Sequence, residues 1–310
     1  MNKRSLSSLR WICASVAVLL SGCQLDVLSP KGDIGVHERS LIFTATGLML
    51  LVVVPVIVLT LWFAWRYRAS NTKATYAPKW AHSNAIEAVM WGIPCVIIAI
   101  LAWITWTSTH KLDPYRPLAS KVKPVTIQAV SLDWKWLFIY PDYGVASVNQ
   151  IAFPVDVPVK FEITSGTVMN AFFIPRLGSQ VYAMAGMQTQ LHLIAREQGS
   201  YEGLSSNYSG AGFSDMHFKA IATSAQGFKD WIGKARAVPA TLDASAYQSL
   251  LKPSERVPVS YYGSVAPGMF AHILQPGAGG MAEAARPMGG MPMAGMAVAP
   301  AHPVPAKAAE

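Results

Sequence analysis

The sequence predicts a membrane hairpin of two transmembrane helices, followed by an all-β domain that ends in helices. Two observations carry this prediction. Residues 41–65 and 88–106 are apolar runs without a charged side chain, and each is long enough to cross roughly 30 Å of hydrocarbon. From residue 125 the pattern changes to short runs rich in β-branched and aromatic residues, separated by turn residues. That pattern is typical of strands.

The composition also favours a membrane protein. Of the 310 residues, 52% are hydrophobic and 14% are charged, which is a high ratio for a soluble domain. The net charge is +8, but Lys and Arg are spread along the chain and form no basic run. We therefore expect no nucleic-acid partner. Cysteine occurs only at positions 13, 23 and 95, so the region beyond them uses neither disulfides nor thiolate metal ligands.

The N-terminus has the features of an exported lipoprotein. Basic residues precede an apolar stretch at 11–20 that is too short to span a bilayer, so residues 1–22 are predicted to be a signal peptide. Residues 19–23, LLSGC, resemble the bacterial lipobox. The resemblance predicts acylation of Cys23 and attachment to membrane lipid, leaving residues 23–38 as a periplasmic segment. A chance apolar segment with a cysteine is the alternative.

The charges between the two apolar runs orient the hairpin. We place transmembrane helices at residues 39–65 and 85–107, with a cytoplasmic loop at 66–84. This loop contains four basic residues and no acid, which places it in the cytoplasm by the positive-inside rule. The chain beyond the second helix is then periplasmic, and we expect the protein in the bacterial inner membrane.

Residues 120–224 are predicted to form the periplasmic β domain, as a sandwich or barrel. Val159, Phe161 and Ile163 alternate with polar residues, as in a half-buried strand. Residues 225–270 follow with helical spacing of apolar positions, and residues 275–310 form a tail of Gly, Ala, Pro and Met that is predicted to be disordered. The expected strands are 125–130, 134–140, 150–153, 159–164, 170–174, 190–195 and 216–222.

One stretch of the β domain has the spacing of a copper site without its ligands. Residues 203–216, GLSSNYSGAGFSDM, resemble the loop of cytochrome c oxidase subunit II, where CSExCGxxHxxM and an upstream His hold the two-copper centre called copper A. Copper in such a centre needs thiolate and imidazole ligands, so the substituted positions are predicted not to bind it. Ser205 and Ser209 stand at the cysteine positions, Asn207 at the Glu, Phe213 at the loop His and Asn170 at the upstream His, and Met216 alone is retained.

A chain that retains the spacing of this loop but lacks its ligands resembles subunit II of the bacterial haem-copper ubiquinol oxidases of the cytochrome o type. The resemblance runs from about residue 23 to about residue 260. It implies a cupredoxin-like Greek-key fold for the β domain. Its most specific motifs are RSLI at 39–42, HSN at 82–84, DWKW at 133–136, FFIPRLGSQ at 172–180 and YAMAGMQT at 182–189.

The resemblance implies a function for a complex. Subunit I would carry haem b, haem o and one copper, oxidise ubiquinol and reduce oxygen to water while protons are pumped. Subunits III and IV would be further partners. This chain would bind no cofactor or metal and would serve structure and assembly.

Several single residues have two interpretations. Glu87 either favours the N-terminus of the second helix electrostatically or, as the resemblance implies, lies at the mouth of a proton-uptake route into subunit I. Trp134 and Trp136 alternate on an expected strand. They are either one core and one surface aromatic or, by resemblance, contacts to subunit I. Four methionines are predicted to fill the core: Met169, Met184, Met187 and Met216.

Two other functions are weaker. A cytochrome c oxidase subunit would need cysteines at positions 205 and 209. A free-standing periplasmic lipoprotein that chaperones copper or assembles a complex would use the methionines of the tail as Cu(I) ligands, but it would not need two spans. The sequence contains no nucleophile triad, phosphate loop or zinc-ligand spacing, so we expect no independent catalytic site in this chain.

Overall fold

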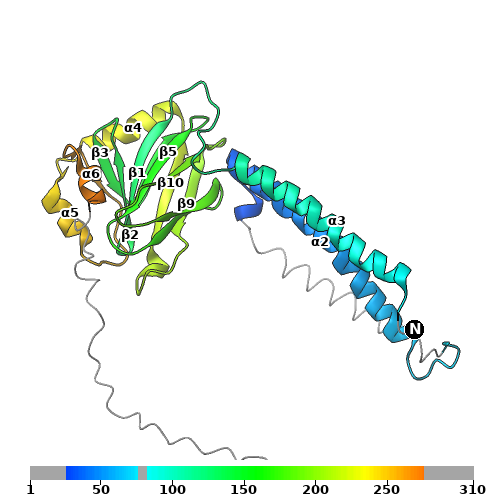
Figure 1. Ribbon diagram of the computed structural model, residues 1–310. Helices are drawn as coiled ribbons and strands as arrows, with labels where there is room; N and C mark the ends of the chain where they lie inside the picture. The colour runs from blue at the N-terminus through cyan, green and yellow to red at the C-terminus, as the bar shows by residue number, and fades with distance from the viewer. Residues whose placement is uncertain (1–25, 76–81, 276–310) are drawn as a thin grey trace, which may run out of the picture.

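The computed structural model describes residues 26–75 and 82–275, in which a helical hairpin projects from one end of a β-sandwich (Figure 1). A 3-10 helix, η1 (Asp26–Leu28), precedes helix α2 (Asp33–Arg66), and helix α3 (Asn84–Lys111) runs beside it. The predicted pair of long apolar helices is confirmed. Both extend past the apolar runs by polar turns, because the helical hydrogen bonds continue where the hydrophobic pattern stops.

The hairpin exposes its apolar surface. By length and composition both helices are able to span a membrane, and almost none of their most apolar stretch is buried within the chain. Pro55 and Pro94 lie inside α2 and α3 without ending them. Trp62 near the end of α2 and Trp106 near the end of α3 are 56% and 67% exposed, as expected for side chains at the two interfaces of a bilayer.

Two sheets form the sandwich, in the strand orders β12-β3-β2-β1-β5-β8 and β4-β10-β9-β6-β7. Two pairs are parallel, β1 with β5 and β4 with β10. The chain therefore crosses repeatedly from one sheet to the other, which gives the predicted Greek-key, cupredoxin-like fold. The strands of the first sheet are β1 (Val125–Leu132), β2 (Lys135–Tyr140), β3 (Val145–Val148), β5 (Val159–Ser165), β8 (Thr189–Leu193) and β12 (Ser260–Tyr262). Those of the second are β4 (Gln150–Pro154), β6 (Asn170–Ile174), β7 (Gly178–Ala183), β9 (Gly199–Ser205) and β10 (His217–Thr223).

Aromatic rings fill the space between the sheets. The ring of Phe172 on β6 lies 5.3 Å from that of Trp136 on β2 and 5.1 Å from that of Phe218 on β10, measured between centroids. All three side chains are 2% exposed or less. Side chains of this size dominate the energetics of a core, so this cluster fixes the two sheets against each other.

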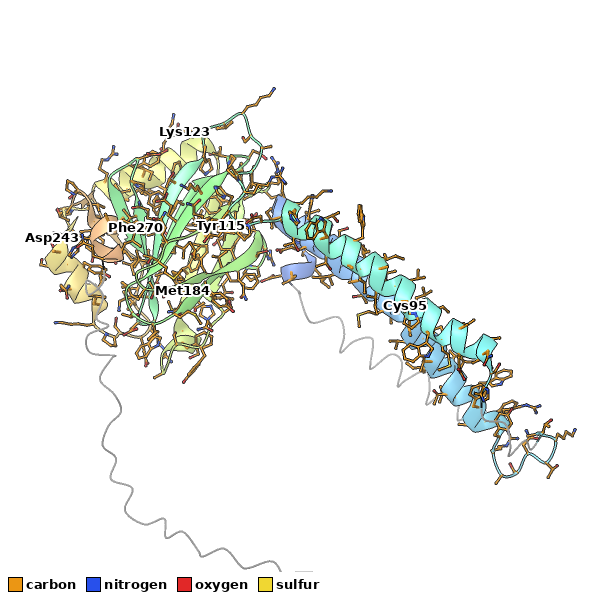
Figure 2. The ribbon with its side chains drawn as sticks, viewed as in Figure 1. Cys95, Tyr115, Lys123, Met184, Asp243 and Phe270 are labelled. Carbon is orange, nitrogen blue, oxygen red and sulfur yellow. The ribbon has the colours of Figure 1, made fainter. Side chains whose placement is uncertain are left out.

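The C-terminal segment closes the sandwich. Helix α4 (Ala225–Arg236) packs Phe228 and Trp231 on the core, and the helices α5 (Ala244–Leu251) and α6 (Met269–Leu274) cover the outer face of the first sheet (Figures 1 and 2). The segment predicted as helical also contains strands. Strand β11 (Thr241–Leu242) pairs with β13 (Ser264–Val265), and β12 pairs with β3, which covers an edge of the sandwich that would otherwise be open.

The start of α2 is fixed to the sandwich. Gly32 forms a bridge with Ala195, and the backbone N–H of Gly35 donates to the carbonyl of Leu177 at 3.1 Å. A Cβ at Gly32 would come within 2.7 Å of the carbonyl oxygens of Leu177 and Ile194, so only glycine allows this approach. Three ion pairs surround the junction: Arg196 with Asp33, Arg176 with Asp26 and Lys31 with Glu197.

Candidate functional site

The loop with the spacing of a copper site joins β9 to β10 at one end of the sandwich. Strand β9 ends at Ser205, the 3-10 helix η2 (Phe213–Asp215) follows, and β10 begins at His217. Because β6 pairs with β9, with Phe172 opposite Ser205, the start of β6 lies beside the loop. The topology thus brings the upstream position, Asn170, to the loop positions that the sequence singled out.

Hydrogen bonds join three of these positions. The hydroxyl of Ser205 donates to Asn170 Oδ1 at 2.8 Å, and its backbone N–H donates to the carbonyl of Met216 at 3.2 Å. All three residues are buried. The amide of Asn170 also donates to the carbonyl of Val168 at 3.3 Å. At the positions that resemble copper-A ligand positions, this chain has a hydrogen-bonded polar pair, Asn170 and Ser205, beside the buried thioether of Met216.

The remaining positions do not complete a donor set. Ser209 Oγ is buried without a hydrogen-bond partner among the described residues. Asn207 turns its amide outward and donates to the carbonyl of Met169 at 3.1 Å. The ring of Phe213 stacks edge-on with that of Tyr208, with centroids 5.6 Å apart.

The donor chemistry does not fit copper A. Hydroxyl, amide and phenyl groups replace two thiolates and two imidazoles, and neutral hydroxyls and amides are poor ligands for copper in competition with soft sulfur and imidazole. The histidines nearest in sequence are committed elsewhere. His192 donates from Nδ1 to the carbonyl of Pro114 at 2.9 Å, and His217 lies 2.9 Å from Glu202 on the surface. In residues 26–75 and 82–275 no group of three or more His, Cys, Asp or Glu side chains is arranged to hold a metal.

Trp134 holds the loop in place. Its indole Nε1 donates to the carbonyl of Ser209 at 3.1 Å, and its ring lies against Gly210 and Gly212, where a Cβ would come within 3.2 and 2.5 Å of it. The expectation that Trp134 lies on a strand was wrong. It occupies the turn between β1 and β2 with a φ of 63°, which turns its ring toward the loop.

Trp136 is a core residue. Its side chain is fully buried in the aromatic cluster, so it has no surface to present to another subunit. Of the pair of tryptophans, only Trp134 is partly exposed.

Lys135, between the two tryptophans, is a buried cation that no pattern in the sequence predicts. Its side chain is 1% exposed, and Nζ donates to the carbonyl of Lys252 at 2.9 Å and to Ser254 Oγ at 2.6 Å. Burial lowers the pKa of Lys135, with the charge of Asp133 opposing the shift. The ammonium group thereby joins the start of β2 to the segment after α5.

Apolar side chains surround the loop on the outside. Met169 and Met187 are 44% and 54% exposed, so the prediction that they fill the core was wrong, whereas Met216 does lie in the core. The segments are adjacent, because Asn207 bonds to Met169 and Ala171 of β6 pairs with Tyr182 of β7. We call the exposed set the loop patch: Val168, Met169, Tyr182, Met187 and Tyr208.

Glu87 lies in the first turn of α3 and is exposed. Its backbone N–H donates to the carbonyl of Ser83 at 2.9 Å, while the Ser83 side chain, at the N-cap, makes no capping bond. The carboxylate has no hydrogen bond or ion pair within the described residues. The signal peptide, Cys23 and the tail beyond residue 275 lie outside the described residues.

Family models and relatives agree with this architecture. Residues 144–223 match the cytochrome c oxidase subunit II periplasmic domain, and residues 236–276 match the COX aromatic rich motif. The second match covers the closing segment with α5, β12 and α6.

Three relatives show how far the similarity extends. The chain is 66% identical over 268 residues to cytochrome bo(3) ubiquinol oxidase subunit 2 of Pseudomonas aeruginosa, covering 86% of this chain and 81% of that protein. It is 56% identical to ubiquinol oxidase subunit 2 of Acetobacter aceti, covering 84% and 85%. To quinol oxidase subunit 2 of Bacillus cereus it is 34% identical, covering 77% and 83%. The periplasmic-domain match agrees with the paired apolar helices and with a loop that lacks copper-ligating side chains. Together with these identities, it shows that the chain belongs to the subunit 2 family of quinol oxidases.

Proposed function

We propose that this chain is subunit II of a ubiquinol oxidase of the aerobic respiratory chain, a complex that oxidises ubiquinol, reduces oxygen to water and pumps protons. One observation carries the proposal beyond the family name: the copper-A positions hold a hydrogen-bonded Ser205–Asn170 pair instead of ligands. A copper-A centre accepts electrons from cytochrome c. A complex without that entrance fits a donor dissolved in the membrane, as ubiquinol is.

The redox groups belong, on this proposal, to the partner. Haem b, haem o and one copper reside in subunit I, and ubiquinol is a substrate of the complex. This chain supplies structure and assembly and binds no cofactor. A copper-chaperone role would rest on the methionines of the tail and leaves the two spans unexplained.

Contacts with subunit I are assigned to two apolar surfaces. The uncovered flanks of α2 and α3 form the first. The second is the loop patch, whose tyrosines and methionines combine large contact area with adaptable shape, together with the exposed edge of Trp134. Subunits III and IV complete the assembly.

The membrane arrangement follows from charge and lipidation. The basic loop between α2 and α3 faces the cytoplasm, and the sandwich lies in the periplasm. Cys23, three residues before the anchored η1 helix, carries the lipid. Two spans then keep the protein in the inner membrane.

Glu87 is assigned the entrance of a proton route into subunit I. The support is its position at the cytoplasmic end of α3 and a carboxylate without a bonded partner in the described part of the chain. An ionisable group that borders the membrane interior is a candidate for a proton path.

A complementation experiment tests these assignments. Membranes lacking this chain should lose ubiquinol-driven oxygen uptake, and the wild-type chain should restore it. Glu87→Gln should assemble with normal haem content yet pump fewer protons per oxygen, with Glu87→Asp intermediate. Glu255→Gln, a periplasmic control, should match wild type. If Glu87→Gln lowers the haem content but leaves the number of protons pumped per oxygen unchanged, Glu87 stabilises the helix and is not part of a proton route.

A further inference from the structure

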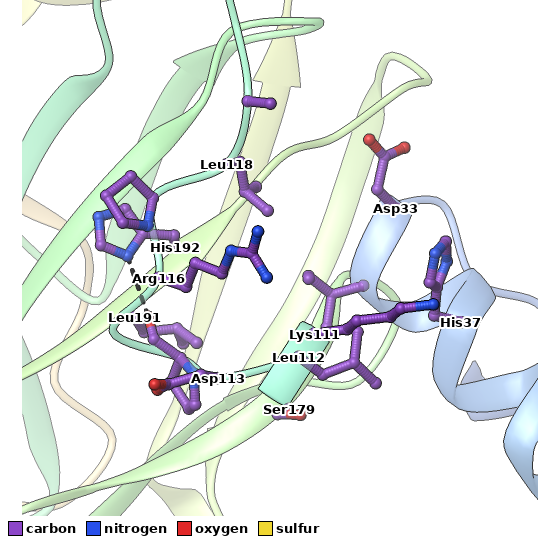
Figure 3. A pocket seen from close by; sticks show the side chains of 14 residues that line it. Asp33, His37, Lys111, Leu112, Asp113, Arg116, Leu118, Ser179, Leu191 and His192 are labelled. Carbon is purple, nitrogen blue, oxygen red and sulfur yellow. Dashed lines mark hydrogen bonds between the residues drawn. The ribbon is translucent and has the colours of Figure 1, made fainter. Parts of the chain in front are cut away.

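A cavity of about 400 Å³ opens where the hairpin meets the sandwich (Figure 3). Its walls come from the start of α2, the end of α3, the linker after α3, and strands β7 and β8. Arg116 of the linker reaches into it from one side, and Lys111 and His37 lie on the opposite side (Figure 3). Basic side chains from both the hairpin and the linker therefore face one hollow.

The cavity has two permanent cations, Arg116 and Lys111. Within the part of the chain that the structure describes, the side chain of Arg116 donates to the carbonyl of His110 at 3.4 Å. Neither Arg116 nor Lys111 forms an ion pair in residues 26–75 and 82–275. Cations without an ion-pair partner that line one hollow favour an anionic occupant.

The two acids that line the cavity are bonded to other groups. Asp33 is bound by Arg196 at 2.5 Å. Asp113 accepts a hydrogen bond from the backbone N–H of Tyr115 at 2.9 Å and points away from Arg116 (Figure 3). Neither acid therefore forms an ion pair with Arg116 or Lys111.

The cavity lies at the depth of lipid headgroups. Trp106, which is 67% exposed, marks the interfacial belt of α3, and Lys111 follows it by about 7.5 Å of helix at 1.5 Å per residue. This is the level at which the phosphates of the adjoining leaflet lie.

Two depressions between α2 and α3 adjoin the cavity. One, of about 350 Å³, shares His37 and Lys111 with the cavity. The other, of about 370 Å³, shares Leu41 and Ser108 with the first and reaches Leu101 and Ala45, with Glu38 also in its lining. A hollow lined by two cations beside this mostly apolar groove has the outline of a headgroup and an acyl chain.

We propose that this cavity and groove bind one anionic phospholipid of the periplasmic leaflet. Arg116 and Lys111 hold the phosphate, and one acyl chain lies between α2 and α3 along Leu41, Ala45 and Leu101. A quinol has no anionic group to match the two cations. A free phosphate would leave the groove empty.

The test is phosphatidylglycerol binding to the purified, delipidated complex, titrated in phosphatidylcholine-containing micelles and measured by native mass spectrometry. Lys111→Gln with Arg116→Gln should weaken binding about 30-fold, from the loss of two headgroup contacts. Ala45→Phe, which fills the groove without changing charge, should also weaken it. The matched control, Lys121→Gln with Lys234→Gln, removes the same charge away from the cavity and should bind as wild type.

Each outcome decides the proposal. Selective loss in the cavity and groove variants, with haem content and ubiquinol-driven oxygen uptake retained, supports it. Equal affinity of the cavity variant and the charge control overturns it and leaves the cavity to a segment of a partner subunit or to quinol. Full displacement by millimolar inorganic phosphate, with no effect of Ala45→Phe, overturns the lipid assignment in favour of an anion site. Failure of the proposed oxidase activity would appear separately, as wild-type complex without oxygen uptake.

Discussion

The hydroxyl of Ser205 donates a 2.8 Å hydrogen bond to the side-chain oxygen of Asn170. By the resemblance to the copper-binding loop, these two residues stand where a cysteine and the upstream histidine would be. Strand β6 approaches the end of β9 at this point, and the hydrogen bond stabilises that approach. The loop is therefore a structural element of the sandwich.

Ser205→Ala should destabilise the protein by about 1–3 kcal/mol, because Asn170 Oδ1 is buried and would lose its donor. Ser209→Ala is the matched control in the same loop. Its hydroxyl is buried without a partner in the described chain, so its removal should leave stability unchanged or raise it. Urea unfolding of the full chain in detergent, followed by tryptophan fluorescence, measures both. A larger loss for Ser209→Ala would contradict the bonding pattern.

Gly212→Ala should loosen the loop from Trp134. The added methyl group would lie 2.5 Å from the indole ring, and such overpacking costs about 1–3 kcal/mol. Faster hydrogen exchange across residues 206–216 is the expected signature. Gly233→Ala in α4, where nothing lies within 4 Å, should instead stabilise by about 0.5–1 kcal/mol, because alanine favours the helix. Unchanged exchange in Gly212→Ala would show that Trp134 does not hold the loop.

Gly32→Ala should weaken the contact between the hairpin and the sandwich. Its effect should be larger than that of a substitution that breaks a neighbouring ion pair. The new Cβ would meet two carbonyl oxygens at 2.7 Å, and backbone cannot move aside as a side chain can. Arg196→Gln removes a half-exposed contact with Asp33 and should cost about 1 kcal/mol or less. Protease sensitivity at residues 29–32 should therefore rise in Gly32→Ala and barely change in Arg196→Gln. Gly47→Ala, in open space on α2, should behave as wild type.

The buried Lys135 should make the free energy of unfolding depend on pH in the alkaline range. Its folded pKa lies below the ordinary 10.5 because of burial, so between these values the unfolded chain binds more protons. Stability therefore rises with pH across that window. The free energy of unfolding of wild type should increase relative to Lys135→Met as the pH approaches 10.5. Parallel pH profiles for the two proteins would show that the buried ammonium group is not under strain.

The sequence predicted those features that depend on local pattern. The apolar runs predicted α2 and α3, alternation located β5, and a run of β-favouring residues between turns located β6. Strands β3, β7 and β9 were missed because they are short or contain Gly and Ser in place of alternating aliphatic residues.

Long-range contacts account for the remaining errors. Lys135 is buried because its acceptors come from residues 252 and 254, more than a hundred positions away. Trp134 faces the loop because the turn before β2 adopts a positive φ, which a strand-like DWKW pattern does not reveal. The exposure of Met169 and Met187 depends on where β6 and β7 end, and their composition alone favours the core.

In the proposed oxidase, electrons do not enter the complex through this chain. Oxygen uptake by the purified complex, with ubiquinol and separately with reduced cytochrome c as donor, decides this point. We expect uptake with ubiquinol alone, and one copper for every two haems in the same preparation. Sustained uptake from cytochrome c, together with additional copper that is lost on changing Met216, would show that electrons do enter through this chain.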